Sequence, residues 1–191
     1  MKHNLNNIPI DELLAAVLVR IKELFEKGNW LISAAFALYK AMCPVLCIDG
    51  IPWRISNGGR VELMALRRRT GPFPDKLVLI GGTVARGESL QDALQRHFKD
   101  DFGVEIEMEE DPFCMSQYHS DKPDDRWLQD PGKDHVVSPV YLVQIQDETP
   151  KQSVQGDSVE WFSREAMPPD EEFGYATERL YHKAFHLFNA R

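Results

Sequence analysis

Three side chains that can bind a metal ion or move a proton lie close together in one short segment of the chain. His97 is followed at three and four residues by Asp100 and Asp101. In a helix, residues at these spacings share one face, so the three side chains are expected to converge. Carboxylate oxygens suit hard divalent cations, and a histidine titrates near neutral pH. The segment therefore predicts metal-assisted or acid–base chemistry.

The residues that precede this cluster are of types that shape a ligand site. An apolar run at 77–80 ends in Gly81 and Gly82, which we expect to let the backbone turn sharply and a ligand approach its carbonyl groups. Glu88 stands at the start of the expected helix, where the helix dipole favours an acid. Arg96 is spaced to reach back to Glu88 and tie the loop to the helix. Without these neighbours, the acidic pair would be explained as a solvated helix face.

Short strands and helices must position this segment. Helical patterns cover about 89–102 and 176–189, and Gly103 follows the first of them in the position of a C-cap glycine. Strands are predicted at 45–48, 51–55, 61–66, 77–80, 104–108, 113–118, 136–145 and 159–162. Asp49 and Gly50 are predicted to form a turn between the first two strands. This order of elements predicts an α/β fold whose sheet is covered on both faces.

The first 43 residues have a different pattern. Apolar residues recur at helical spacing over 11–25, and a second apolar segment covers 30–42 before Pro44. We therefore expect a helical hairpin at 1–43 in front of a main domain at 44–191. Its apolar faces would pack on the main domain or on a second copy, giving a homodimer through these helices. A role at the membrane surface is disfavoured because the polar face mixes acids with bases.

Composition restricts the class of partner. The chain has 191 residues, 43% of them hydrophobic, and a net charge of −8, so a folded core is expected and general nucleic-acid binding is not. No apolar stretch is long enough to span a bilayer, and the first residues lack the pattern of a signal peptide. The three cysteines are too few for a disulfide framework. We therefore expect a cytoplasmic protein without a membrane partner.

The segment from Gly82 to Val104 resembles the box of the Nudix hydrolase superfamily. That box reads Gly, five residues, Glu, seven residues, Arg-Glu, an aliphatic or aromatic residue, any residue, Glu-Glu, any residue, Gly and an aliphatic residue. The residues on their expected places are Gly82, Glu88, Arg96, Phe98, Gly103 and Val104. His97 replaces the glutamate after the arginine, and Asp100 and Asp101 replace the Glu-Glu pair. Flanking similarity, including 63–69, 130–141 and 157–168, extends the resemblance over about 44–191.

The resemblance implies a Nudix-like α/β/α sandwich with a mixed sheet. It also implies hydrolysis of a nucleoside diphosphate linked to another group, with a sugar nucleotide or an ADP-ribose-like compound as the substrate. Mg²⁺ or Mn²⁺ would be the cofactor, because a divalent cation neutralises the phosphates and lowers the pKa of a bound water.

Roles for the box residues follow from the resemblance position by position. The implied metal ligands are the carbonyl group of Gly81 and the carboxylates of Asp100 and Asp101. The implied catalytic residues are Glu88, which orders the loop, His97 and Asp101. The residues with a structural role in the box are Gly82, Arg96 and Gly103. For His97 three interpretations stay open: a ligand of Mn²⁺ or Zn²⁺, a general base, or a structural residue that hydrogen-bonds to Asp101 or simply packs.

Residues outside the box are also implicated. Arg67 and Arg69 are candidates to bind phosphate, with surface solubility as the alternative explanation. His135 precedes the central strand and either lines the substrate cleft or is a structural histidine. The candidates for a further acid are Asp121, Asp124, Asp125, Glu171 and Glu172.

The departures from the box leave a second functional class open. A Nudix fold with a changed box can bind a nucleotide as a sensor without cleaving it, since a fold does not fix a function. The hairpin at 1–43 would then transmit the signal or form a dimer. A structural protein with an inactive pocket is the third interpretation. Metal dependence and turnover separate the enzyme from the sensor.

Overall fold

The computed structural model describes residues 18–19, 39, 43–71, 73–118, 135–145, 153 and 157–190. The chain divides into two units, Met1–Cys43 and Pro44–Arg191. The predicted helical hairpin lies outside the described residues except at Leu18, Val19, Tyr39 and Cys43, so it stays a prediction. The elements named below belong to the second unit.

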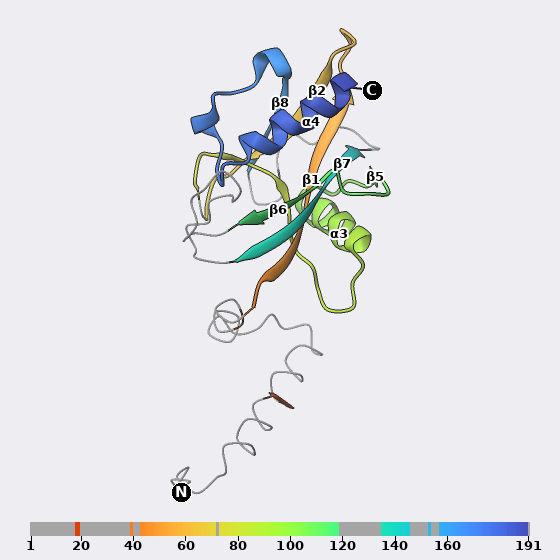
Figure 1. Cartoon of the computed structure of the whole chain (residues 1–191), viewed down its shortest axis with the longest axis vertical. Coiled ribbons are helices and arrows are strands. Elements are labelled where there is room, and N and C mark those ends of the chain that lie inside the picture. Colours follow the sequence, from red (N-terminus) through yellow and green to blue (C-terminus); the bar gives the residue numbers. More distant parts are fainter. Residues whose placement is uncertain are drawn as a thin grey trace, which may run out of the picture. The chain divides into compact units, whose positions relative to one another are not determined.

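The second unit is built on one mixed sheet (Figure 1). Its two longest strands, β1 (Val45–Ile55) and β7 (Val136–Ile145), pair in parallel. The other described strands are β2 (Val61–Arg67), β3 (Leu77–Val78), β4 (Ile80–Thr83), β5 (Ile106–Met108), β6 (Cys114–Tyr118) and β8 (Ser158–Ser163). The strand order is β3-β2-β1-β7-β5, with β4 on β1, β6 on β7 and β8 on β2, all in antiparallel pairs apart from β1 with β7.

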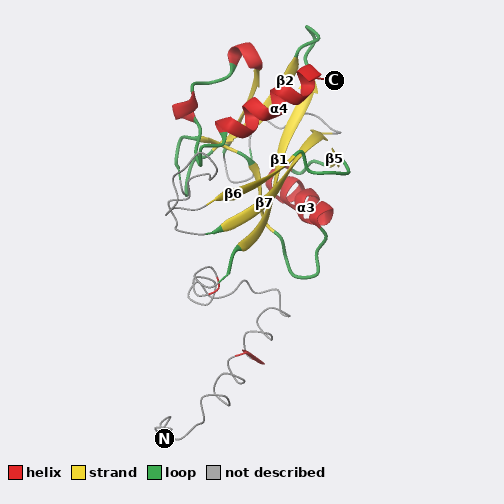
Figure 2. Ribbon diagram, in the orientation of Figure 1, coloured by secondary structure: helices red, strands yellow, loops and turns green. Residues whose placement is uncertain are grey.

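Each face of the sheet is covered by one helix (Figure 2). The helix α3 (Leu90–Phe102) buries Ala93, Leu94 and Phe98 in a cluster with residues of β1, β2, β4 and β7. The helix α4 (Glu178–Ala190) joins the cluster on the opposite face through Leu180, Tyr181, Ala184 and Phe185. Residues of one strand alternate between the two clusters, because successive side chains of a strand point to opposite faces. The predicted α/β/α sandwich with a mixed sheet is therefore confirmed.

The predicted turn at Asp49 and Gly50 is wrong. Both residues lie inside β1, which runs without interruption from Val45 to Ile55. Gly50 is buried, and a Cβ atom at this position would lie 3.0 Å from Cε2 of Phe98. The glycine therefore lets α3 approach the strand closely, and the similarity of Asp-Gly to a hairpin turn was misleading.

The predicted sharp turn at Gly81 and Gly82 is also wrong. Both glycines lie within β4, where Gly81 pairs with Asp49 and Gly82 pairs with Ile48 of β1. A Cβ atom at Gly81 would lie only 2.0 Å from the carbonyl oxygen of Ile48. The glycines therefore allow two strands to approach closely, and the chain turns only after Thr83.

The ends of α3 are fixed by local hydrogen bonds. The Ser89 side chain caps the first turn by accepting a hydrogen bond from the Asp92 backbone N–H at 3.0 Å. Gly103 ends the helix in the left-handed conformation, with φ of 71°, and its N–H donates to the Lys99 carbonyl at 2.9 Å. The C-cap predicted at Gly103 is confirmed. Neither described helix has the length and apolar character needed to span a membrane.

Candidate functional site

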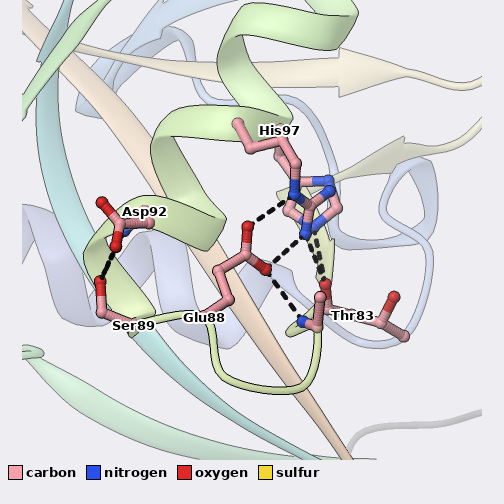
Figure 3. A network of polar contacts seen from close by, with 7 residues as sticks. Thr83, Glu88, Ser89, Asp92 and His97 are labelled. Atoms are coloured by element: carbon pink, nitrogen blue, oxygen red, sulfur yellow. Dashed lines mark hydrogen bonds and ion pairs between the residues drawn. The ribbon is translucent and has the colours of Figure 1, made fainter. Parts of the chain in front are cut away.

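The loop between β4 and α3 is held by a pair of charged residues (Figure 3). Glu88 accepts hydrogen bonds from Arg96 Nε at 2.7 Å and Arg96 Nη2 at 2.9 Å. The Ala85 backbone N–H also donates to the Glu88 carboxylate, at 2.9 Å. The bond from Arg96 lowers the pKa of Glu88 to about 2, although partial burial opposes this effect. Glu88 is therefore a carboxylate at neutral pH, and it ties the loop to the helix.

The carbonyl group of Thr83, at the end of β4, receives two donors from α3. Arg96 Nη2 donates to it at 3.1 Å, and His97 Nε2 also lies 3.1 Å from it (Figure 3). Because a carbonyl oxygen can only accept, we assign the imidazole proton to Nε2, which leaves Nδ1 with a lone pair. Burial lowers the pKa of His97, although the Thr83 carbonyl opposes this effect, so the ring is neutral at pH 7.

The His97 ring also packs closely on the box glycine. A Cβ atom at Gly82 would lie 2.6 Å from His97 Cε1 and 2.9 Å from Nε2. A side chain at position 82 would therefore displace the ring from the Thr83 carbonyl. The contact explains why a strand position next to this helix is occupied by glycine.

The acids of the box differ in exposure. Asp100 is exposed at the end of α3, whereas Asp101 is half-buried. Burial raises the pKa of Asp101, and the nearby carboxylates of Asp100 and Asp157 raise it further, while His97 and Arg68 oppose this shift. Negative charge is therefore concentrated around Asp101.

Asp157 was not among the predicted acids outside the box. It precedes β8, is only 7% exposed, and accepts a hydrogen bond from the Arg69 backbone N–H at 2.6 Å. The sequence signal that could have identified it is its place as the first residue of the segment 157–168, which resembles the Nudix superfamily. Sequence reasoning missed it because its electrostatic effect on Asp101 depends on the pairing of β8 with β2. Of the predicted acids, Asp121, Asp124 and Asp125 lie outside the described residues.

The three consecutive arginines after β2 have different surroundings. Arg67 binds the carboxylates of Glu160 and Glu172, the latter at 2.9 Å, and these bonds raise its pKa. The Arg68 Nη1 atom lies 3.0 Å from the hydroxyl oxygen of Tyr175. Arg69 is exposed, and its backbone N–H donates to the Asp157 carboxylate.

Strand alternation explains this difference. Met64 and Leu66 face the cluster under α3, so Arg68, two residues further, is directed to that face. Arg67 is directed to the other face. Arg68 is thus the arginine of this group that lowers the pKa of Asp101 electrostatically, and alternation along the strand was the signal for its direction.

His135 is placed beside the start of β1. Its carbonyl group accepts a hydrogen bond from the Val45 backbone N–H at 2.8 Å, and its side chain is half-buried. Val45 is four residues from Asp49, the strand partner of Gly81, which corresponds to about 13 Å along a strand. The predicted role of His135 in substrate binding stays a prediction.

The acids of the site fit a cation that arrives with phosphate groups. Within the described part of the chain, no three His, Cys, Asp or Glu side chains form a group that could hold a metal ion. Mg²⁺, however, is commonly bound by one or two carboxylates together with water and substrate phosphates. Asp100 and Asp101, with Asp157 acting on Asp101 electrostatically, provide such a partial set. Burial and charge repulsion both raise the pKa of Asp101, and a cation would relieve the repulsion. His97 Nε2 points its proton at a carbonyl and is not available as a ligand atom.

Solved structures of several proteins resemble this chain. A possible asymmetric diadenosine tetraphosphate hydrolase from Jonesia denitrificans is 24% identical, with a TM-score of 0.63 over 76% of this chain and 94% of that chain. The NUDIX domain of Shewanella oneidensis NrtR, solved with ADP ribose, is 17% identical, with a TM-score of 0.57 over 82% of this chain and 99% of that chain. A MutT/nudix family protein from Enterococcus faecalis is 20% identical, with a TM-score of 0.59 over 91% of this chain and 74% of that chain.

These similarities show that the chain has the Nudix fold. Residues 26–187 match the family described as a domain of unknown function (DUF4916), and the chain belongs to that family. No curated protein matches the sequence.

Proposed function

We propose that this protein hydrolyses a nucleoside diphosphate linked to another group, at the site formed by the box and the end of β2. A sugar nucleotide or an ADP-ribose-like compound is the proposed substrate, and Mg²⁺ or Mn²⁺ the proposed cofactor. Two of the similar structures support this substrate class, since one is a possible diadenosine tetraphosphate hydrolase and another holds ADP ribose. The similarity at 24% identity or less shows the fold alone, so the activity rests on the site.

The observation that carries the proposal is the environment of Asp101. Burial and the carboxylates of Asp100 and Asp157 raise the pKa of this half-buried carboxyl group, whereas His97 and Arg68 lower it electrostatically. Acids beside an arginine match a diphosphate and its cation, because the acids hold the cation and the guanidinium contacts phosphate oxygens. In this proposal Asp100, Asp101 and the Gly81 carbonyl hold the cation.

The chain's own residues have separate tasks in this proposal. Glu88 and Arg96 keep the loop in place before the substrate binds, so little ordering is needed at that moment. Arg68 binds and orients the diphosphate; Arg69 and His135 remain the other proposed substrate contacts. A bound divalent cation supplies charge neutralisation and a water of lowered pKa.

His97 is the proposed general base. Its Nε2–H bond to Thr83 fixes the ring, so that the lone pair on Nδ1 is held in one orientation. This atom takes the proton of the attacking water. Burial and Arg96 disfavour the protonated ring, whereas the Thr83 carbonyl and the negative charges of Asp101 and Glu88 favour it and offset part of that cost when the imidazolium forms.

The experiment that tests the proposed function is a panel of substrates with matched variants. Nucleoside diphosphate sugars, ADP-ribose, dinucleoside polyphosphates and nucleoside triphosphates are incubated with Mg²⁺ or Mn²⁺, and phosphate-containing products are measured. We expect turnover of one of the first two classes. Asp101→Asn, which keeps the shape and removes the charge, should lower kcat/KM by at least about 100-fold.

The matched control is Asp111→Asn, at an exposed acid between β5 and β6. It changes the net charge equally and should leave kcat/KM within about twofold of the wild-type value. Full activity of Asp101→Asn would place the cation elsewhere. No turnover of any member of the panel would reject the enzyme.

A nucleotide sensor is the second candidate function, and the bonds of His97 favour it. The loop is fixed by hydrogen bonds from Arg96 and His97, so it is ordered without a cation. A sensor would bind ADP-ribose or a sugar nucleotide equally well with EDTA and with Mg²⁺, and would release no product. Calorimetric titration under both conditions distinguishes the two functions.

The proposed homodimer rests on the sequence of residues 1–43 alone. If apolar helix faces join two copies, light scattering should give twice the chain mass of 21.9 kDa. Leu14→Asp together with Leu18→Asp should then give the mass of one chain.

A cytoplasmic location is likewise a proposal from the sequence.

A further inference from the structure

Two backbone segments near Arg68 contain residues other than glycine in the left-handed conformation. Phe73 and Asp75, between β2 and β3, have φ angles of 57° and 61°. Tyr175 and Ala176, just before α4, have φ angles of 58° and 56°. Side chains make this conformation unfavourable, so it persists where the surrounding structure requires it, and such residues gather at functional sites. The presence of two strained segments near one arginine therefore suggests that they have a functional role.

The two segments pack against each other. The rings of Phe73 and Tyr175 meet edge to face, with their centroids 4.7 Å apart. A Cβ atom at Gly174 would lie 2.9 Å from Cβ of Phe73, so the backbones approach closely. The N–H of Gly174 donates to the Leu77 carbonyl of β3 at 2.8 Å. The position of the Tyr175 ring is thus fixed from both sides.

Both segments contact Arg68. Its backbone N–H donates to the Lys76 carbonyl at 3.0 Å, and its carbonyl accepts from the Asp75 N–H at 2.7 Å. Its Nη1 atom donates to the Tyr175 hydroxyl oxygen at 3.0 Å, and its guanidinium carbon lies 6.0 Å from the centre of the Tyr175 ring. One strained segment therefore fixes the backbone of this arginine and the other fixes its side chain.

We propose that Tyr175 is a positioning residue that directs the Arg68 guanidinium toward the diphosphate of the substrate beside Asp101. This inference rests on the proposed function and adds a residue to its site. An arginine side chain loses much rotamer freedom when it binds a ligand, and holding it in advance reduces that cost. Because Tyr175 acts through Arg68, its loss should weaken substrate binding more than it slows the chemical step.

The test compares Tyr175→Phe with the wild type in the full-length protein. The variant keeps the ring and removes the hydroxyl group that accepts from Arg68. KM for the best substrate of the panel and Kd for ADP-ribose should rise about tenfold, as expected for a lost hydrogen bond to a charged group, with kcat within about twofold. In ¹⁵N-labelled protein, the Nε–H and Nη–H signals of Arg68 should show faster guanidinium rotation.

Two further variants serve as controls. Tyr181→Phe removes a buried hydroxyl group that binds the carbonyls of Met64 and Val78, and should leave KM and Kd within about twofold. In an Arg68→Ala protein, adding Tyr175→Phe should change KM and Kd by less than about twofold, because the two residues act as one unit.

Several results would overturn the inference. One is unchanged Arg68 motion in Tyr175→Phe; another is unchanged KM and Kd despite faster motion. An equal loss in the wild-type and Arg68→Ala backgrounds would show that Tyr175 acts by another route. If the wild type neither binds nor cleaves any compound of the panel, the proposed function fails together with the binding part of this inference. The NMR comparison then still decides whether Tyr175 holds Arg68.

Discussion

At the scale of single residues, the loop before α3 is ordered by bonds that need no cation. The Thr83 carbonyl receives donors from Arg96 and His97, and the Glu88 carboxylate receives donors from Arg96 and Ala85. A glutamate at position 97 could not donate to Thr83 at neutral pH. The histidine in the box therefore changes the local structure as well as the chemistry.

The first prediction concerns Glu88 and stability. Glu88→Gln should lower the free energy of unfolding at pH 7 by about 1–3 kcal/mol, because the charge-assisted bonds to Arg96 are weakened. The pKa of Glu88 is lowered from 4.5 to about 2 in the folded chain, so this contribution is complete above pH 4.5 and declines as the pH falls toward 2. Urea unfolding of both proteins between pH 7 and pH 3 measures the difference. A difference that stays constant down to pH 3 contradicts the prediction.

The second prediction concerns His97 and separates its two tasks. The side-chain amide of Gln can donate to Thr83 as Nε2–H does, but it cannot take a proton. His97→Gln should therefore lower kcat about 100-fold and leave the free energy of unfolding within about 1 kcal/mol. Steady-state kinetics and urea unfolding measure the two effects.

A second substitution at position 97 tests the alternative that the imidazole weakens the site instead of acting as a base. His97→Glu restores the glutamate of the Nudix box. If it raises the Mg²⁺-supported rate above that of the wild type, the imidazole weakens the site and the base role is wrong.

At the scale of elements, the glycine pair of β4 controls how closely the box is built onto β1. Gly81 lies against the backbone of Ile48 and Asp49, and Gly82 lies against the His97 ring. Gly81 thus allows β4 to approach β1, and Gly82 allows it to approach α3. Larger side chains at these two positions would push the start of the loop away from α3.

The third prediction tests this constraint. Gly81→Ala places a Cβ atom 2.0 Å from a backbone oxygen that cannot rotate away. The pairing of β4 with β1 must shift, and the free energy of unfolding should fall by about 3 kcal/mol or more. Gly58→Ala is the matched control, because its nearest neighbour atom would be 3.9 Å away, and it should change stability by less than about 0.5 kcal/mol. Thermal unfolding of both variants measures the effect, and equal stabilities would contradict it.

At the scale of the whole Nudix unit, α4 packs on β2, β3 and β8 from the face opposite the box. Tyr181 is fully buried, and its hydroxyl group donates to the Met64 carbonyl of β2 at 3.2 Å and lies 3.4 Å from the Val78 carbonyl of β3. Its ring contacts Phe162 of β8 and Phe173. One side chain thus contacts three strands. Arg68 follows one of them, β2, and Asp157 precedes another, β8.

The fourth prediction follows from this position. Tyr181→Phe keeps the ring contacts and removes one buried hydrogen bond, so the free energy of unfolding should fall by about 1 kcal/mol. Since the hydroxyl group lies on the face opposite His97, kcat should stay within about twofold of the wild-type value. Urea unfolding and steady-state kinetics check both statements, and a loss of kcat with little loss of stability would connect α4 to the box.

Local patterns predicted the parts of this protein that depend on local physics. The C-cap of α3 at Gly103, the helix that carries Asp100 and Asp101, and the succession of strands and helices were readable because they arise from spacings of a few residues. Asp49 and Gly50 were wrongly predicted as a turn. An Asp-Gly pair is typical of hairpin turns, but here the glycine is required by the close packing of Phe98.

The sequence by itself determined the layered α/β fold and the segment where chemistry is expected, since periodicity and the box spacing are properties of neighbouring residues. Only the tertiary structure decided that Arg67 is bound by Glu160 and Glu172, and that Arg68 and Asp157 act electrostatically on Asp101. Both depend on the register of β2 with β8 and on the face to which each side chain points. Register joins residues about 90 positions apart, and no local pattern encodes that distance.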